Sequence, residues 1–212
     1  MANIAHVAEH TARDLIDHLP CLQGLVPFCT APVIVLFGSR RFAWPLAFIS
    51  SVISLIISVM LMIIVREGGY ISSPLGGWPP PLGIEYRIDA TNAFVLMLIS
   101  TIGTVVLPFA YTSIKNEIRN RDHTLLYACW MLCFTGLLGM VATGDAFNVF
   151  VFLEISSLST YVLVAQGASK DRRALTAAYD YLIMGTIGAT FFVIGLGMLY
   201  MATGTLNLAD LA

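Results

Sequence analysis

The sequence predicts an all-α integral membrane protein with about six transmembrane helices, on the evidence of its charge content, its hydropathy and the length of its apolar runs. Charged residues make up 11% of the 212 residues, where a soluble domain has about 25%. Hydrophobic residues make up 58%, and the mean hydropathy is +0.82. The apolar residues gather in runs of about 20, the length that crosses a bilayer as a helix.

Six apolar runs are expected to span the membrane. They cover residues 19–37, 43–65, 89–111, 125–141, 147–165 and 174–202. The last run is long enough to tilt or to extend beyond the membrane. It contains Gly185, Gly188, Gly195 and Gly197, which are interpreted as helix-packing glycines. One six-helix transmembrane domain is therefore predicted over residues 19–212.

Two segments lie outside the predicted helices. In residues 1–18, Ile4, Val7, Ala8 and Leu15 recur at helical spacing, which predicts an amphipathic helix on the membrane surface. Residues 66–88 form the longest polar segment, and three consecutive prolines at 79–81 prevent a regular helix there. Its glycines and aromatic residues suggest turns or a hairpin on the outer surface.

The basic residues predict the orientation in the membrane. Three loops on one side hold Arg40, Arg41, Lys115, Arg119, Arg121, Lys170, Arg172 and Arg173, and the other side holds Arg13, Arg66 and Arg87. Cytoplasmic loops carry the excess of Lys and Arg. We therefore expect a multi-pass protein of the inner (plasma) membrane, with the three basic loops in the cytoplasm and both termini outside.

The sequence argues against several other functions. It contains no nucleotide-binding loop, metalloprotease motif or hydrolase elbow, so neither a cofactor nor an enzymatic activity is expected. The net charge of −2 argues against nucleic acid as a partner. His6 and His10 are four residues apart, but no third ligand accompanies them, so no metal site is expected. The four cysteines are interpreted as apolar filler.

Glu154 is the principal candidate for a functional residue. It lies within the apolar stretch NVFVFLEISSLSTYVLV of residues 148–164. A charged acid at a helix centre costs about 2.5–3.5 kcal/mol on insertion scales, and such residues usually mark ion or proton paths. A structural carboxyl that pairs this helix to a neighbour is the alternative. Ser157 and Tyr161 share its helix face at i+3 and i+7 and are possible hydrogen-bonding partners.

Three further polar residues are secondary candidates. Asp145 and Asn148 stand at the outer end of the same helix, where an acid suits either a helix cap or an entry point for ions. Asp180 lies about two turns into the last helix, between Tyr179 and Tyr181. It is either solvated at the membrane interface or a second acid along the proton path.

Three separated motifs give the chain a family resemblance. TGDAFNVFVFLEISSLSTYVLVA, GGWPPPLGIEYRID and YLIMGTIGATFFVIGLGMLYMATGTLNLADLA resemble the proton-conducting, antiporter-like membrane subunits of respiratory complex I. The chain looks closest to the D-type subunit of Mrp-type multisubunit cation/proton antiporters. The resemblance covers nearly all of the chain from about residue 20. It implies two inverted five-helix repeats with a line of buried charges along the membrane midplane.

The resemblance also implies a function. Glu154 corresponds to a glutamate on the fifth helix of the family, which pairs with a lysine on the seventh. In Mrp-type complexes the proton movement is exchanged for sodium, and this is the function expected here. A proton-pumping membrane subunit of an NADH-quinone oxidoreductase or membrane-bound hydrogenase is the first alternative. A structural membrane subunit without conduction is the second.

The expected partners follow from the size of the family members. They have about fourteen helices, whereas six are predicted here, and Lys115 and Lys170 both lie in predicted cytoplasmic loops. We expect either that another polypeptide supplies the later helices and the partner lysine, or that the chain is a split or truncated form. Other membrane subunits, protons, sodium and the lipid bilayer are the remaining expected partners.

Overall fold

The computed structural model describes residues 2–37, 40–78, 80, 83–117, 123–169 and 171–212. The side chains of residues 2–17, 40, 77, 116–117 and 169 are outside this description. Helices account for most of it: α1 Ala2–Phe37, α2 Arg40–Gly68, α3 Ala90–Glu117, α4 His123–Ala142, α5 Ala146–Gln166, α6 Arg173–Thr203 and the short α7 Leu208–Leu211. Two short 3-10 helices cover Leu75–Gly77 and Gly167–Ser169. Helices α1 to α6 are each long and apolar enough to cross a membrane, which confirms the six predicted spans.

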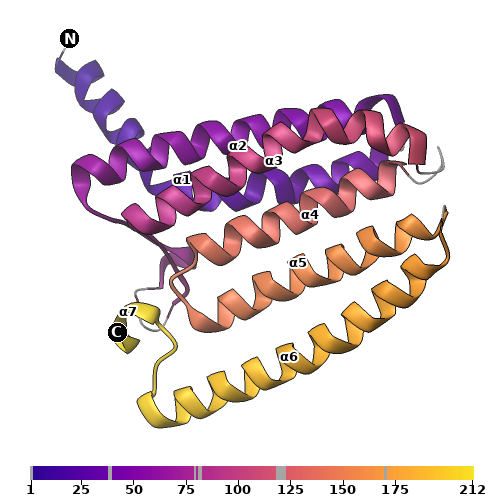
Figure 1. Cartoon of the computed structure of the whole chain (residues 1–212). Helices are drawn as coiled ribbons and strands as arrows, with labels where there is room; N and C mark the ends of the chain where they lie inside the picture. The colour runs from indigo at the N-terminus through magenta and orange to yellow at the C-terminus, as the bar shows by residue number, and fades with distance from the viewer. Residues whose placement is uncertain (1, 38–39, 79, 81–82, 118–122, 170) are drawn as a thin grey trace.

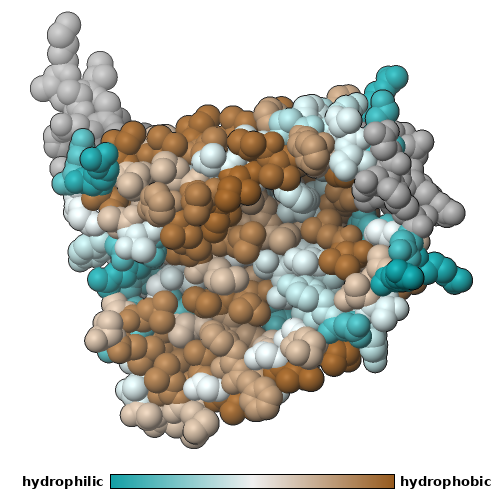
Figure 2. All heavy atoms as spheres, in the orientation of Figure 1, coloured by the Kyte–Doolittle hydropathy of each residue, from teal (hydrophilic) through white to brown (hydrophobic). Residues whose placement is uncertain are grey.

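The six long helices run side by side with alternating direction (Figure 1). Helices α1 to α4 form a bundle, α5 packs against α4, and α6 packs against α5 at the edge of the molecule. A band of apolar surface crosses the middle of the molecule and polar residues gather towards its two ends (Figure 2). This distribution is what a multi-pass membrane protein requires.

The helix ends and the chain termini are divided between the two ends of the bundle. Helices α1, α3 and α5 end, and α2, α4 and α6 begin, at the end that the predicted basic loops occupy. Both termini and the polar segment between α2 and α3 lie at the opposite end (Figure 1). The relative placement of the termini agrees with the predicted topology, and the side of the membrane that they face stays a prediction.

Helix α1 is longer than the predicted span. The prediction separates a surface helix at residues 1–18 from a span at 19–37, but the structure has one helix that continues through Pro20, Pro27 and Pro32. Each proline removes one backbone donor and bends a helix without having to end it. The first turns of α1 project away from the bundle (Figure 1). The amphipathic face of residues 1–18 falls on side chains outside the described set, and its membrane contact stays a prediction.

The polar segment between α2 and α3 folds into the anticipated hairpin. Strands β1 Ile71–Pro74 and β2 Glu85–Ile88 pair antiparallel, with Ile71 opposite Ile88 and Pro74 opposite Glu85. Gly69 and Gly76 have φ of 89° and 71°, values that favour glycine, where the chain enters and leaves β1. Tyr86 of β2 packs against Phe152 of α5 with ring centroids 6.4 Å apart. The hairpin therefore closes the end of the bundle next to α5.

A buried polar seam connects α1, α2 and α3 at the centre of the bundle. Gln23 is fully buried, and its Nε2 donates to Ser58 Oγ at 2.7 Å and to Ser100 Oγ at 3.3 Å. The two serine hydroxyls lie 2.8 Å apart. Gln23 Oε1 and Ser54 Oγ are buried without a hydrogen-bond partner among the described residues. Hydrogen bonds of this kind join helices in lipid, where hydrophobic burial does not.

Two glycines of α4 allow a close contact with α5. A Cβ added at Gly136 would lie 2.7 Å from the Phe152 carbonyl oxygen and from backbone and Cβ atoms of Ser156. A Cβ added at Gly139 would overlap the Phe152 ring. Helices α4 and α5 can therefore approach closely only because both positions lack a side chain.

The interpretation of the α6 glycines is only partly right. A Cβ at Gly185 would meet the Tyr161 hydroxyl, so this glycine does pack against α5. Cβ positions at Gly188, Gly195 and Gly197 meet no described atom within 4 Å. At these three positions the packing interpretation is wrong within the described chain, because α6 packs mainly against α5 and leaves most of its surface exposed.

Candidate functional site

Helix α5 begins at a well-defined cap. Asp145 has extended backbone dihedrals, and its Oδ1 accepts from the Asn148 backbone N–H at 2.8 Å. Asn148 Nδ2 donates to Thr143 Oγ1 at 3.0 Å. The Asp145 carboxylate thus satisfies one of the free N–H groups at the helix start. Its negative charge also interacts favourably with the positive end of the helix dipole. This geometry assigns Asp145 and Asn148 to the cap. Their role in ion entry stays a prediction.

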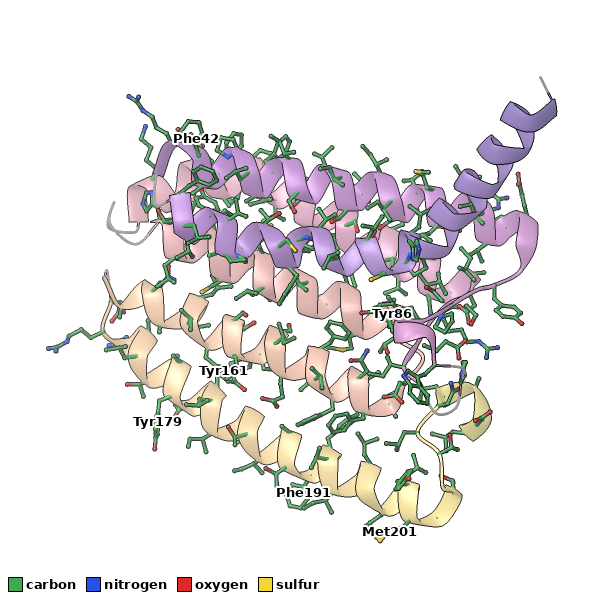
Figure 3. All side chains as sticks on the ribbon, turned by 180° about the vertical axis from the view of Figure 1, so that it is seen from behind. Phe42, Tyr86, Tyr161, Tyr179, Phe191 and Met201 are labelled. Carbon is green, nitrogen blue, oxygen red and sulfur yellow. The ribbon has the colours of Figure 1, made fainter. Side chains whose placement is uncertain are left out.

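The two long faces of α5 contact different helices. On one face Phe152 and Ser156 contact the two α4 glycines, and Thr160 Oγ1 lies 3.4 Å from Cys133 Sγ of α4. On the opposite face Phe150 stacks on Phe192 of α6 with centroids 6.3 Å apart. Tyr161, on the same face, meets Tyr181 of α6 edge-on at 5.1 Å (Figure 3 shows Tyr161 between α5 and α6).

Glu154 belongs to the face that α5 turns towards α6. Residues 150, 154, 157 and 161 follow one another at i+4, i+3 and i+4, so they share one stripe of the helix. The aromatic contacts of Phe150 and Tyr161 show that this stripe faces α6. The antiparallel register of those contacts places Glu154 at the level of Gly188, where no Cβ occupies the space. The side chain of Glu154 is half-buried.

The depth of Glu154 makes it chemically unusual. It stands eight residues after the start of α5 and twelve before its end. At 1.5 Å per residue these offsets are about 12 Å and about 18 Å. A carboxylate at this depth lies in the apolar band, where an unbalanced charge is costly. It must be protonated, hydrated or balanced by a cation.

No described side chain supplies that balance. The Glu154 side chain makes no hydrogen bond and no ion pair with any residue whose side chain the structure describes. Ser157 and Tyr161 share its stripe but do not bond to it, and the Tyr161 hydroxyl lies against Gly185 instead. The anticipated hydrogen bonds from these two residues to Glu154 are therefore absent within the described chain.

Asp180 lies apart from Glu154. It is exposed on α6 between the exposed Tyr179 and Tyr181. It is seven residues past the start of α6, and the register places it about two turns from the level of Glu154. The structure does not bring these two acids together.

A second cluster joins the three sequence motifs at the end of the bundle that holds the hairpin. Glu85 of β2 is 5% exposed, and its carboxylate accepts from Ser72 Oγ at 2.7 Å and from Asn207 Nδ2 at 3.0 Å. The Gly144 N–H donates to the Glu85 carbonyl at 2.7 Å. The Leu208 N–H donates to the Gly144 carbonyl at 2.8 Å. We call Glu85, Gly144 and Asn207, with these bonds, the outer clamp, because the predicted topology places this end outside.

The outer clamp determines how the segment after α6 returns to α5. The Ala146 N–H at the start of α5 donates to the Leu206 carbonyl at 2.9 Å. Asn207 is 4% exposed and also caps α7 through the Ala209 N–H at 2.9 Å. Sequence reasoning missed Glu85 and Asn207 because they are 122 residues apart, and no local pattern pairs them. The signal that could have found them is that each lies within one of the three motifs of the family resemblance.

Residues 143–212 match the family described as NADH:quinone oxidoreductase/Mrp antiporter, transmembrane. The D subunit of the Na(+)/H(+) antiporter of Alkalihalophilus pseudofirmus is 30% identical over 198 residues, which cover 93% of this chain and 39% of that protein. The chain is therefore similar in sequence to antiporter-like membrane subunits.

Two further similarities go beyond the antiporters. The N subunit of the NADH-quinone oxidoreductase of Desulforudis audaxviator is 46% identical over 138 residues, 65% of this chain and 27% of that protein. A chain of the membrane-bound sulfane sulfur reductase, an archaeal respiratory membrane complex, superposes with a TM-score of 0.80 at 30% identity. That superposition covers 93% of this chain and 39% of its counterpart. The chain thus spans well under half the length of the relatives it matches.

Proposed function

We propose that this antiporter-like chain is a membrane subunit, or the N-terminal part of one, of a multisubunit Na⁺/H⁺ antiporter, and that Glu154 takes up and releases the transported proton. One observation carries the proposal. A carboxyl group stands at mid-span on α5, on the stripe facing α6, with no described partner to neutralise it. The homology to an antiporter D subunit over 93% of the chain supports the choice of antiport.

The chemistry follows from the surroundings of Glu154. Apolar burial favours the neutral acid, whereas an approaching cation favours the carboxylate. A cation that approaches Glu154 from the α6 side would therefore make it release its proton, and a cation that moves away would let it take one up. The family resemblance implies a lysine from a later helix in this role, which we expect from another part of the complex.

The location and partners of the chain are part of the same proposal. We place it in the inner (plasma) membrane with both termini outside and the three basic loops in the cytoplasm, on the basis of the basic-residue count. Its partners are the other membrane subunits of the antiporter and the helices that carry the cation.

Glu154→Gln tests the proposal in the assembled complex. The substitution keeps the size and the hydrogen-bonding capacity of the side chain and removes the titratable proton. We expect loss of Na⁺-dependent proton exchange in inverted membrane vesicles, measured with a pH-sensitive fluorescent dye, with normal complex assembly on native gels. Glu67→Gln is the matched control, because Glu67 is exposed at the end of α2. Normal exchange in an assembled Glu154→Gln complex would refute the proton role.

The 46% identity to the N subunit of an NADH-quinone oxidoreductase favours a second candidate function. In this alternative the same site pumps protons in a redox-driven complex. Affinity purification through this chain distinguishes the two: iron–sulfur proteins and substrate-dependent proton pumping support the redox complex, and small membrane subunits alone support the antiporter. A structural subunit without conduction predicts instead that Glu154→Gln leaves transport unchanged while deletion of the chain abolishes assembly.

A further inference from the structure

A cavity opens at the end of the bundle opposite the outer clamp. It has a volume of about 590 Å³ and lies where α2 and α4 begin and α3 ends. Its lining includes Arg41, Trp44, Tyr111, Lys115, His123 and Tyr127. Figure 3 shows this end of the bundle at Phe42, far from Tyr86 and the hairpin. The cavity takes no part in the site around Glu154.

The charges around the cavity suit an anion. Arg41 and Lys115 are exposed, and within the described set of side chains neither makes a hydrogen bond or an ion pair. No described carboxylate lines the cavity. Arg offers a planar fork of donors that matches a phosphate, and Lys adds a compact charge with three donors. Both cations are therefore available to the same anionic group.

The aromatic wall of the cavity is held in place. The Trp44 indole N–H donates to the Leu107 carbonyl at 3.0 Å. Its ring stacks on Phe48 with centroids 5.4 Å apart and meets Tyr111 at 5.1 Å. Tyr127 and His123 are buried and form the inner wall. A fixed aromatic wall next to two exposed cations is a preformed binding surface, which lowers the entropy cost of binding.

The position of the cavity along the helices indicates the kind of anion. Arg41 begins the second spanning segment, Lys115 ends the third and His123 begins the fourth. The cavity therefore lies where the apolar band meets the polar end of the molecule, at headgroup level. Exposed apolar side chains also lie on two of its helices: Phe42 and Ile49 on α2, and Val105 and Phe109 on α3. They offer an apolar surface for acyl chains on the helices that carry the two cations.

We propose that this cavity binds the headgroup of an anionic phospholipid, with the lipid phosphate between Arg41 and Lys115 and the acyl chains along α2 and α3. A basic pocket between helix ends is a recognised chemistry for anionic headgroups, and each cation near a membrane surface contributes about a fivefold gain in affinity. Bound lipid would connect the ends of α2, α3 and α4. The site is independent of Glu154 and of the ion exchanged.

The test measures lipid binding to the purified full chain. The chain in detergent is titrated with phosphatidylglycerol or with phosphatidylcholine, and bound lipid is counted by native mass spectrometry. We expect preferential binding of phosphatidylglycerol. The double substitution Arg41→Gln/Lys115→Gln should lower its affinity by about 25-fold if the two fivefold contributions add. Unchanged far-UV circular dichroism shows that the double variant is folded, and Lys115→Arg should retain binding.

A matched control separates a site from general attraction. Arg172→Gln/Arg173→Gln removes the same charge from the same end of the molecule, at exposed residues outside the cavity lining. It should change phosphatidylglycerol affinity by less than about twofold. An equal loss in both double variants would overturn the proposal, since it would mean non-specific attraction. Equal occupancy by inorganic phosphate, with no preference for lipid, would overturn the lipid assignment.

Discussion

The close approach of α4 and α5 yields a quantitative prediction for Gly136→Ala. The added Cβ would lie 2.7 Å from backbone atoms of Phe152 and Ser156, whereas ordinary contacts begin at 3.4 Å. Backbone atoms cannot rotate away, so the two helices must separate by about 0.7 Å. A gap of about 0.5–1 Å forfeits a quarter to a half of the dispersion attraction of each contact. Overpacking of this kind costs about 1–3 kcal/mol.

Gly195→Ala is the matched control for this substitution. A Cβ at Gly195 on α6 meets no described atom within 4 Å. Alanine is a better helix former than glycine by about 1 kcal/mol, and this gain applies at both positions. The difference in unfolding free energy between the two variants therefore isolates the packing cost.

The assay is unfolding of the purified chain in mixed micelles by titration with sodium dodecyl sulfate, followed by circular dichroism at the helix band. We expect Gly136→Ala to be less stable than Gly195→Ala by about 1–3 kcal/mol. If the two variants unfold within about 0.5 kcal/mol of each other, the backbone contact does not limit the approach of α4 to α5.

Three other predictions concern the outer clamp, the polar seam and the hairpin. Asn207→Ala should destabilise the chain by about 1–3 kcal/mol in the same titration, because the buried Glu85 carboxylate loses a donor; Asn92→Ala, at a partly buried amide outside the clamp, should cost less, and equal losses would count against the clamp. Gln23→Leu should change stability by less than about 1.5 kcal/mol, because Ser58 and Ser100 keep their mutual bond and an unpartnered buried oxygen is removed; a larger loss would show that the amide holds the seam together. Burial, with the nearby Cys21 thiol as a smaller cause, raises the pKa of Tyr86 from 10.0 to about 12. The neutral, buried Tyr86 therefore contributes fully to the stability of the folded chain below pH 10, and this contribution is lost as the pH rises through about 12. The tyrosinate absorbance of the chain should therefore contain a late component that Tyr86→Phe removes, and a late component that persists in Tyr86→Phe would contradict the assignment.

Much of the fold could be predicted because its signals are local. Each span is a run of apolar residues, and every predicted run lies within a helix of the structure or begins one residue before it. The hairpin follows from prolines and glycines between two helices, and the cap at Asp145 follows from an acid before an apolar run. The continuous α1 was missed, because the amphipathic pattern of its first half predicted a surface helix separate from the apolar span.

Only part of the site could be predicted, because only part of it has a local signal in the sequence. Glu154 stands out in the sequence because a carboxyl within an apolar run is costly whichever helices pack around it. The outer clamp leaves no local trace, since Glu85 and Asn207 meet only when the hairpin and the segment after α6 come together.

The sequence by itself determined the membrane class, the six spans, the grouping of basic residues and the depth of Glu154, because each depends on composition along one stretch of chain. The tertiary structure alone decided the side of α5 that carries Glu154, the glycines that let α4 approach, and the joining of three motifs at one end. Those features depend on the rotation of each helix about its axis and on its neighbours. Rotation and neighbours follow from the packing of all the helices at once.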